Sequence, residues 1–122
     1  RYTDHDFGVN AIGCWHIAQA AAAHRIRRVV QTGPQVTALD SLVGYHADYD
    51  VPGDAPSRPG RNLYGHTKYL GNETLRVFAE WHDLEVPVLV FNGFVTAESR
   101  GRNAFESTFE ECADAIVRAL EA

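Results

Sequence analysis

Tyr64 and Lys68 are spaced as a pair that could transfer protons. They lie four residues apart in the segment Tyr64-Gly65-His66-Thr67-Lys68, and this spacing places both side chains on one face of a helix, one turn apart. A free phenol loses its proton only near pH 10, and a cation held beside it favours the phenolate form. The pair could therefore serve as a general acid and base. The alternative for so short a motif is an ordinary solvated helix face.

Three helices are expected in the chain, and the second carries this pair. Apolar residues recur at intervals of three and four over residues 7–24, and alanines raise the helix propensity there. The inner face of this helix is expected to hold Val9, Ile12, Gly13, His16, Ile17, Ala20 and Ala21. A second helix is expected over 62–82, with Asn62 as its cap. A third is expected over 109–122.

Two short runs rich in β-branched residues predict buried parallel strands. They cover residues 27–32 and 86–91. Residues 33–62 are rich in glycine, proline and aspartate and are expected to form a long loop of the kind found at active sites. His46, Asp48, Asp50 and Asp54 gather in this loop, but Pro52 breaks the calcium-loop pattern, so we expect no metal site.

Three blocks of the sequence resemble one protein family. Val9–Trp15 resembles its Asn-x-x-Gly helix, Pro59–Lys68 its Pro-x-x-x-Tyr-Gly-x-Ser-Lys segment, and Val88–Phe94 its strand that ends in Phe-Asn. The family is the extended branch of the short-chain dehydrogenases/reductases, the NAD-dependent epimerases and dehydratases. This resemblance implies an α/β, Rossmann-like (doubly wound) fold and an enzyme acting on a nucleotide sugar or a similar hydroxyl substrate.

The same resemblance implies a role for four residues. Tyr64 would exchange the proton of a sugar hydroxyl while hydride moves to or from the nicotinamide. Lys68 would bind the nicotinamide ribose and support the phenolate, and Asn10 would lie near the cofactor. Asn92 would contact the phosphate or sugar of a nucleotide-sugar substrate.

The catalytic hydroxyl of the family has no clear counterpart. After the first strand the chain reads Gln31-Thr32-Gly33-Pro34-Gln35-Val36, and the family spacing falls on Gly33. Thr32, one residue earlier, supplies the hydroxyl only if the loop shifts to bring it within hydrogen-bond distance of the substrate. Thr32 is therefore a candidate catalytic residue with a loop residue as the alternative.

The glycine-rich turn that receives a dinucleotide pyrophosphate does not occur in the sequence. None of the ten glycines forms Gly-x-Gly-x-x-Gly or Gly-x-x-Gly-x-x-Gly, although such a turn lets backbone amides approach the pyrophosphate. We expect residues 1–122 to form a single partial Rossmann-like domain without the N-terminal glycine-rich βαβ unit. NAD or NADP is the expected cofactor, but the chain alone is expected to bind it weakly.

Composition excludes several function classes. The formal charge is −5 and 45% of the 122 residues are hydrophobic, which is typical of one soluble domain. The one basic cluster, at residues 25–28, is too short for a nucleic-acid groove. No apolar run approaches the roughly 20 residues of a membrane span. A cytoplasmic protein is expected, with Cys14 and Cys112 as reduced thiols.

Two parallel strands alone leave unpaired strand edges and exposed apolar surface, which another protein surface is expected to bury. In the family, helices equivalent to 7–24 and 62–82 pair with a second subunit, so a homodimer through these helices is expected, with Trp15 and Trp81 at or near the interface.

Two functions stay open. One is an NAD(P)-dependent epimerase, dehydratase or reductase. The other is a non-catalytic truncated remnant that serves in oligomerisation or interaction.

Overall fold

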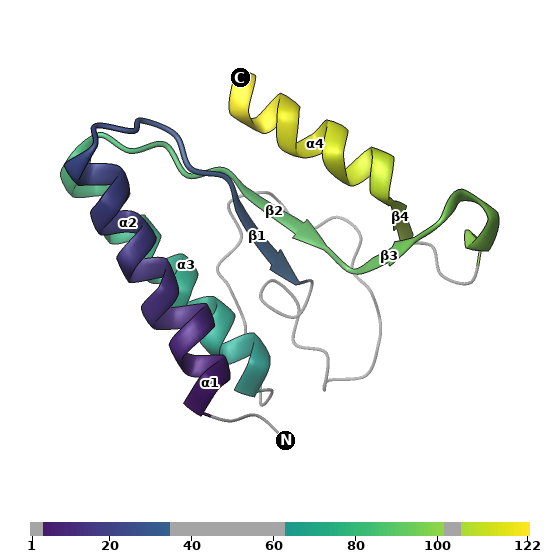
Figure 1. The fold of residues 1–122 in the computed structure, drawn as a ribbon, viewed down its shortest axis with the longest axis horizontal. Helices are drawn as coiled ribbons and strands as arrows, with labels where there is room; N and C mark the ends of the chain where they lie inside the picture. The colour runs from purple at the N-terminus through teal and green to yellow at the C-terminus, as the bar shows by residue number, and fades with distance from the viewer. Residues whose placement is uncertain (1–3, 35–62, 102–105) are drawn as a thin grey trace.

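The computed structural model describes residues 4–34, 63–101 and 106–122 (Figure 1). Its helices are α1 (Asp4–Phe7), α2 (Gly13–Ala23), α3 (Leu63–His82) and α4 (Phe109–Glu121). A π-helical turn, η1 (Gly8–Ile12), joins α1 to α2, and a 3-10 turn, η3 (Ala97–Ser99), follows the third strand. The strands are β1 (Gln31–Pro34), β2 (Val88–Phe91), β3 (Gly93–Val95) and β4 (Glu106–Thr108).

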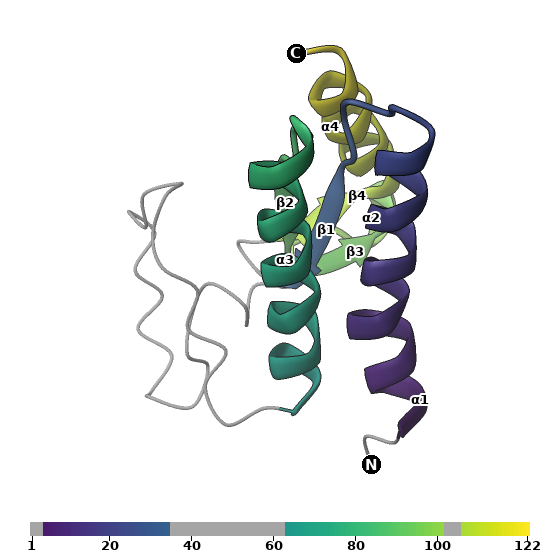
Figure 2. The same cartoon turned by 90° about the vertical axis from the view of Figure 1, so that its left-hand side faces the viewer.

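Strands β1 and β2 are parallel, with Gln31 opposite Val88 and Pro34 opposite Phe91. Helices α2 and α3 lie side by side on one side of this pair, and α4 lies on the other (Figures 1 and 2). The helices α2 and α3 run antiparallel to the strands. The C-terminal end of β1 is therefore at the same end of the molecule as the N-terminus of α3 (Figures 1 and 2). Parallel strands with helices on both sides confirm the predicted α/β, partial Rossmann-like fold.

The strand predictions need two corrections. The first strand, expected over 27–32, begins only at Gln31, and the chain before it contributes a single bridge between Arg28 and Glu85. A second parallel pair, β3 with β4, was not predicted. Each of these strands has three residues, too few to show an alternating pattern.

The predicted inner face of the first helix is wrong for most of its residues. Val9, Ile12 and Ile17 are 56%, 46% and 56% exposed, whereas Ala21 is buried as predicted. The other buried residues of this segment are Ala11, Cys14 and Ala18. The π turn has a wider repeat than an α-helix and changes which side chains face inward. Small side chains then fill the seam with α3, where Cys14, Ala18 and Leu75 form the core with Phe78 and Val86 packed against it.

Two ion pairs join the segments that follow the C-terminal ends of α2 and α3. Arg27 pairs with Asp83, and Arg28 pairs with Glu85. Backbone bonds join the same segments, since Glu85 N donates to Arg27 O over 2.7 Å. Arg27 and Arg28 of the basic cluster therefore connect two chain segments that are far apart in the sequence.

Candidate functional site

Tyr64 and Lys68 lie in the first two turns of α3, which begins at Leu63. Both side chains are half-buried, while His66 between them is exposed. The helix therefore holds the phenol and the ammonium one turn apart on a partly sheltered surface, as their spacing predicts. Gly65 and Thr67, on the inner side of the same turns, are buried.

Asn10 is tied to this turn through Thr67. Its side-chain amide donates to Thr67 Oγ1 over 3.1 Å, and Thr67 Oγ1 donates to the backbone carbonyl of Tyr64 over 2.9 Å. Asn10 lies in the π turn η1, and π turns in helices are frequent at functional sites. The structure thus links Asn10 to the backbone of Tyr64 through the Thr67 hydroxyl.

Thr32 lies within β1, and Asn92 lies just beyond the end of β2. Thr32 is exposed on β1, opposite Leu89 of β2, and its neighbour Gly33 is buried. Asn92 is half-buried and follows β2 directly. Ligands of such folds bind beyond the carboxyl ends of the strands, and this is the end where α3 presents Tyr64.

Several sequence predictions fall outside the described residues. These are the helix cap at Asn62, most of the expected loop over 33–62, and its acidic residues between His46 and Asp54. Within the described residues, no three or more His, Cys, Asp or Glu side chains gather as metal ligands would. None of the described helices combines the length and apolar character needed to cross a bilayer.

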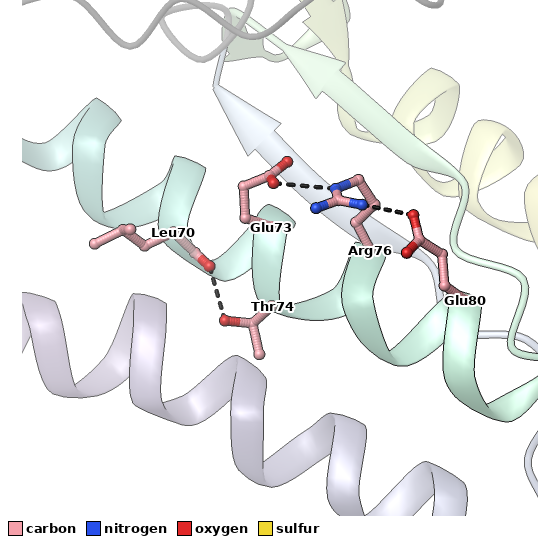
Figure 3. Close-up of polar contacts among 5 residues, drawn as sticks. All are labelled: Leu70, Glu73, Thr74, Arg76 and Glu80. Atoms are coloured by element: carbon pink, nitrogen blue, oxygen red, sulfur yellow. Dashed lines mark hydrogen bonds and ion pairs between the residues drawn. The ribbon is translucent and has the colours of Figure 1, made fainter.

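Glu73 belongs to an ion-pair network on α3 (Figure 3). Arg76 contacts Glu73 over 3.0 Å and Glu80 over 2.5 Å. The hydrogen bond and the charge of Glu73, with a further contribution from Glu80, raise the pKa of Arg76. The network lies on an exposed face of the helix, where water screens the charges, so it contributes little to the stability of the helix.

A second feature is an apolar groove along the seam of α2 and α3, which we call the seam groove. One part, of about 630 Å³, is lined by residues that include Trp15, Val77, Phe78 and Trp81. The adjoining part, of about 440 Å³, shares Trp15 and Val77 and continues to Phe7 and Ile12. Trp81 is 77% exposed and Trp15 is 44% exposed. Apolar surface of this extent on a helix pair is typical of an interaction site.

The role of Thr67 is a feature that the sequence did not reveal. Thr67 was assigned no role from the sequence, although the resembled family has a serine at this position of its motif. A hydroxyl residue between a tyrosine and a lysine four apart was the available signal. Its pairing with Asn10 could not be inferred, because the two are 57 residues apart in the sequence.

Comparison with known proteins gives a likeness of fold. No protein-family model matches the chain, and no curated protein matches it. Among solved structures, it is similar to the enzyme WbmH of Bordetella bronchiseptica, determined in complex with NAD+, with a TM-score of 0.62 and 17% identity. The likeness covers 93% of this chain and 42% of that one, so the chain spans less than half the length of WbmH. At this identity the comparison shows a likeness of fold alone.

Proposed function

We propose that the chain carries the acid/base half of an NAD(P)-dependent epimerase/dehydratase or reductase acting on a nucleotide sugar or a similar hydroxyl substrate. The observation that carries this proposal is the position of Tyr64 and Lys68. They lie on the first two turns of α3, at the end of the fold where β1 and β2 terminate (Figures 1 and 2). Ligands of doubly wound sheets bind there, and WbmH, which shares the fold, binds NAD+.

The described residues fit the nicotinamide end of a dinucleotide. A half-buried ammonium at Lys68 and a half-buried phenol at Tyr64 match the needs of a ribose and a reacting hydroxyl. No glycine-rich turn for the pyrophosphate occurs in the sequence, so the phosphate end is not provided by such a turn of this chain. When bound, the cofactor would accept or return a hydride.

The residues of the chain would handle the proton and the substrate. Tyr64 takes the proton of the sugar hydroxyl or returns it, and Lys68 holds the ribose and supports the phenolate. Thr32, exposed at the second position of β1, offers a hydroxyl to the substrate oxygen. Asn92, after β2, offers an amide to the phosphate or sugar.

Substitution of Tyr64 tests this assignment. The protein is incubated with NAD+ and UDP-glucose, and NADH and sugar products are followed by absorbance and chromatography. Tyr64→Phe keeps the ring and removes the dissociable proton, so we expect turnover to fall by about 10²- to 10⁴-fold. His66→Gln, on the exposed side of the same turn, is the matched control. Full activity in Tyr64→Phe would show that the resemblance extends to the fold only.

Thr32→Ala extends the same assay to the missing serine. A loss of turnover comparable to that of Tyr64→Phe would show that Thr32 replaces it, because a positioned hydroxyl acts on the same proton transfer. Turnover near that of the parent would leave Thr32 a loop residue.

A second candidate is a non-catalytic module that serves in association. The seam groove favours it, because large apolar side chains such as Trp81 are left exposed. Calorimetric titration with NAD+ and NADP+ separates the candidates. Weak cofactor binding together with turnover supports the enzyme, whereas a self-associated chain with neither binding nor turnover supports the module.

A further inference from the structure

We infer that Asn10 and Thr67 are positioning residues for Tyr64: they form a relay that fixes the first turn of α3 and so the direction of the phenol. This inference rests on the proposed function, because it concerns the acid/base of that reaction. The relay runs from the Asn10 amide to Thr67 Oγ1 over 3.1 Å and from Thr67 Oγ1 to the Tyr64 carbonyl over 2.9 Å.

Burial makes the relay specific. Thr67 is 6% exposed, so its hydroxyl cannot exchange these partners for bulk water without opening the helix pair. A threonine hydroxyl has one proton to donate and accepts through its lone pairs. Here the proton goes to the Tyr64 carbonyl, and a lone pair receives the Asn10 amide. Loss of either partner leaves a polar group unsatisfied in the seam.

The backbone on both sides of the relay is also constrained. Asn10 lies in the π turn η1, and its carbonyl lies directly against Gly71 of α3, where an added Cβ would overlap it. Asn10 therefore meets α3 twice, through its side chain at Thr67 and through its carbonyl at Gly71. The π turn and Gly71 together fix the position of the Asn10 side-chain amide along the axis of α3, beside the turn that carries Tyr64.

A second threonine in the same helix offers a control. Thr74 donates its hydroxyl to the Leu70 carbonyl over 2.9 Å (Figure 3). This is the same kind of side-chain bond to the preceding turn, but it lies farther along α3 and does not involve Asn10. If the relay acts only by stabilising the helix, loss of the Thr67 hydroxyl and loss of the Thr74 hydroxyl should affect the environment of the Tyr64 phenol equally.

The test observes the phenol itself and does not depend on turnover. The five tyrosines are replaced with 3-fluorotyrosine, and the ¹⁹F resonance of Tyr64 is assigned by its loss in Tyr64→Phe. We expect Thr67→Val to move this resonance toward that of free 3-fluorotyrosine. Thr67→Ser, which keeps the hydroxyl, should restore the parent position, and Thr74→Val should leave it unchanged.

Asn10→Ala examines the other end of the relay and covers the case in which Thr67→Val does not fold. We expect it to move the Tyr64 resonance in the same direction, because Thr67 then lacks its donor. A parent-like Tyr64 resonance in Asn10→Ala or in folded Thr67→Val overturns the inference, as does an equal shift in Thr74→Val.

Turnover separates this inference from the proposed function. In the assay with NAD+ and UDP-glucose, Thr67→Val should lower kcat about tenfold with KM little changed, since misplacement of a reacting group lowers the rate of the chemical step. If Tyr64→Phe keeps full activity while the ¹⁹F shifts appear as expected, the proposed function is wrong and the relay stands. If the ¹⁹F shifts are absent while Tyr64→Phe loses turnover, the relay is wrong and the proposed function stands.

Discussion

Gly71 allows α3 to approach the backbone of α2 and the π turn before it. A Cβ at this position would overlap the Asn10 carbonyl and would lie 2.8 Å from Cys14 Sγ. Since a backbone carbonyl cannot turn aside as a side chain can, Gly71→Ala must push the two helices apart. We expect overpacking to cost about 1–3 kcal/mol, which exceeds the gain of roughly 1 kcal/mol in helix propensity.

Urea unfolding of Gly71→Ala measures this balance, and Gly8→Ala is the control. A Cβ at Gly8 would meet nothing within 4 Å, so there the same change should leave the free energy of unfolding equal or higher. A Gly71→Ala variant at least as stable as the parent would mean that the helices do not lie this close.

At the residue scale, spacing located the candidate side chains but not their partners. The four-residue interval predicted that Tyr64 and Lys68 share a helix face, because that geometry is local. The contact of Asn10 with Thr67 depends on how two helices pack, and the π turn that sets it left no pattern in the sequence. The expected position of Asn10 beside a cofactor stays a prediction.

At the element scale, α4 begins with a capping box. Thr108 Oγ1 accepts from Glu111 N, and a carboxylate oxygen of Glu111 accepts from Thr108 N over 2.9 Å. Arg100 also contacts Glu111, over 2.7 Å. The backbone bond from Thr108, followed by the Arg100 contact, lowers the pKa of Glu111. The ionised carboxylate therefore favours the folded helix.

The pH dependence of α4 follows from the sign of this shift. Because the folded pKa of Glu111 lies below the unfolded value of about 4.3, its contribution is present above that pH and is lost as the pH falls through the folded pKa. Thermal unfolding from pH 7 to pH 3, followed by circular dichroism, should show a smaller pH dependence in Glu111→Gln than in the parent.

Glu110→Gln, which removes the neighbouring charge of the same first turn, is the control for that measurement. It should keep most of the pH dependence of the parent, because Glu110 is not the N3 residue of the capping box. Equal effects of the two substitutions would assign the dependence to the helix dipole rather than to the box.

The elements were predictable where local signals agree. Helix α4 begins at Phe109, as expected, because an apolar stripe and a threonine cap coincide there. Helix α3 ends at His82, also as expected. Strands β3 and β4 could not be predicted, since their pairing of Gly93 with Glu106 is decided by contacts between segments and not by composition.

At the scale of the whole molecule, the seam groove determines the oligomeric state that we expect in solution. It runs along α2 and α3, the two helices for which a homodimer was predicted, and its large side chains are exposed although the seam beneath them is packed. Large aromatic residues are the usual anchors of protein interfaces. We propose that a second copy of the chain covers this face with its own α2 and α3.

Sedimentation velocity at tens of micromolar tests this assembly with Trp81→Glu, which puts a charge at a side chain that is 77% exposed in the single chain. We expect the parent to sediment as a dimer and the variant as a monomer, because removal of an aromatic anchor costs about 2–4 kcal/mol of association free energy. Val117→Glu is the matched control, since Val117 is 49% exposed but lies on α4, which is on the other side of β1 and β2 from α2 and α3 (Figure 1). It should leave the dimer intact. A parent that sediments as a compact monomer would refute the dimer, and dissociation by Val117→Glu alone would place the contact on α4.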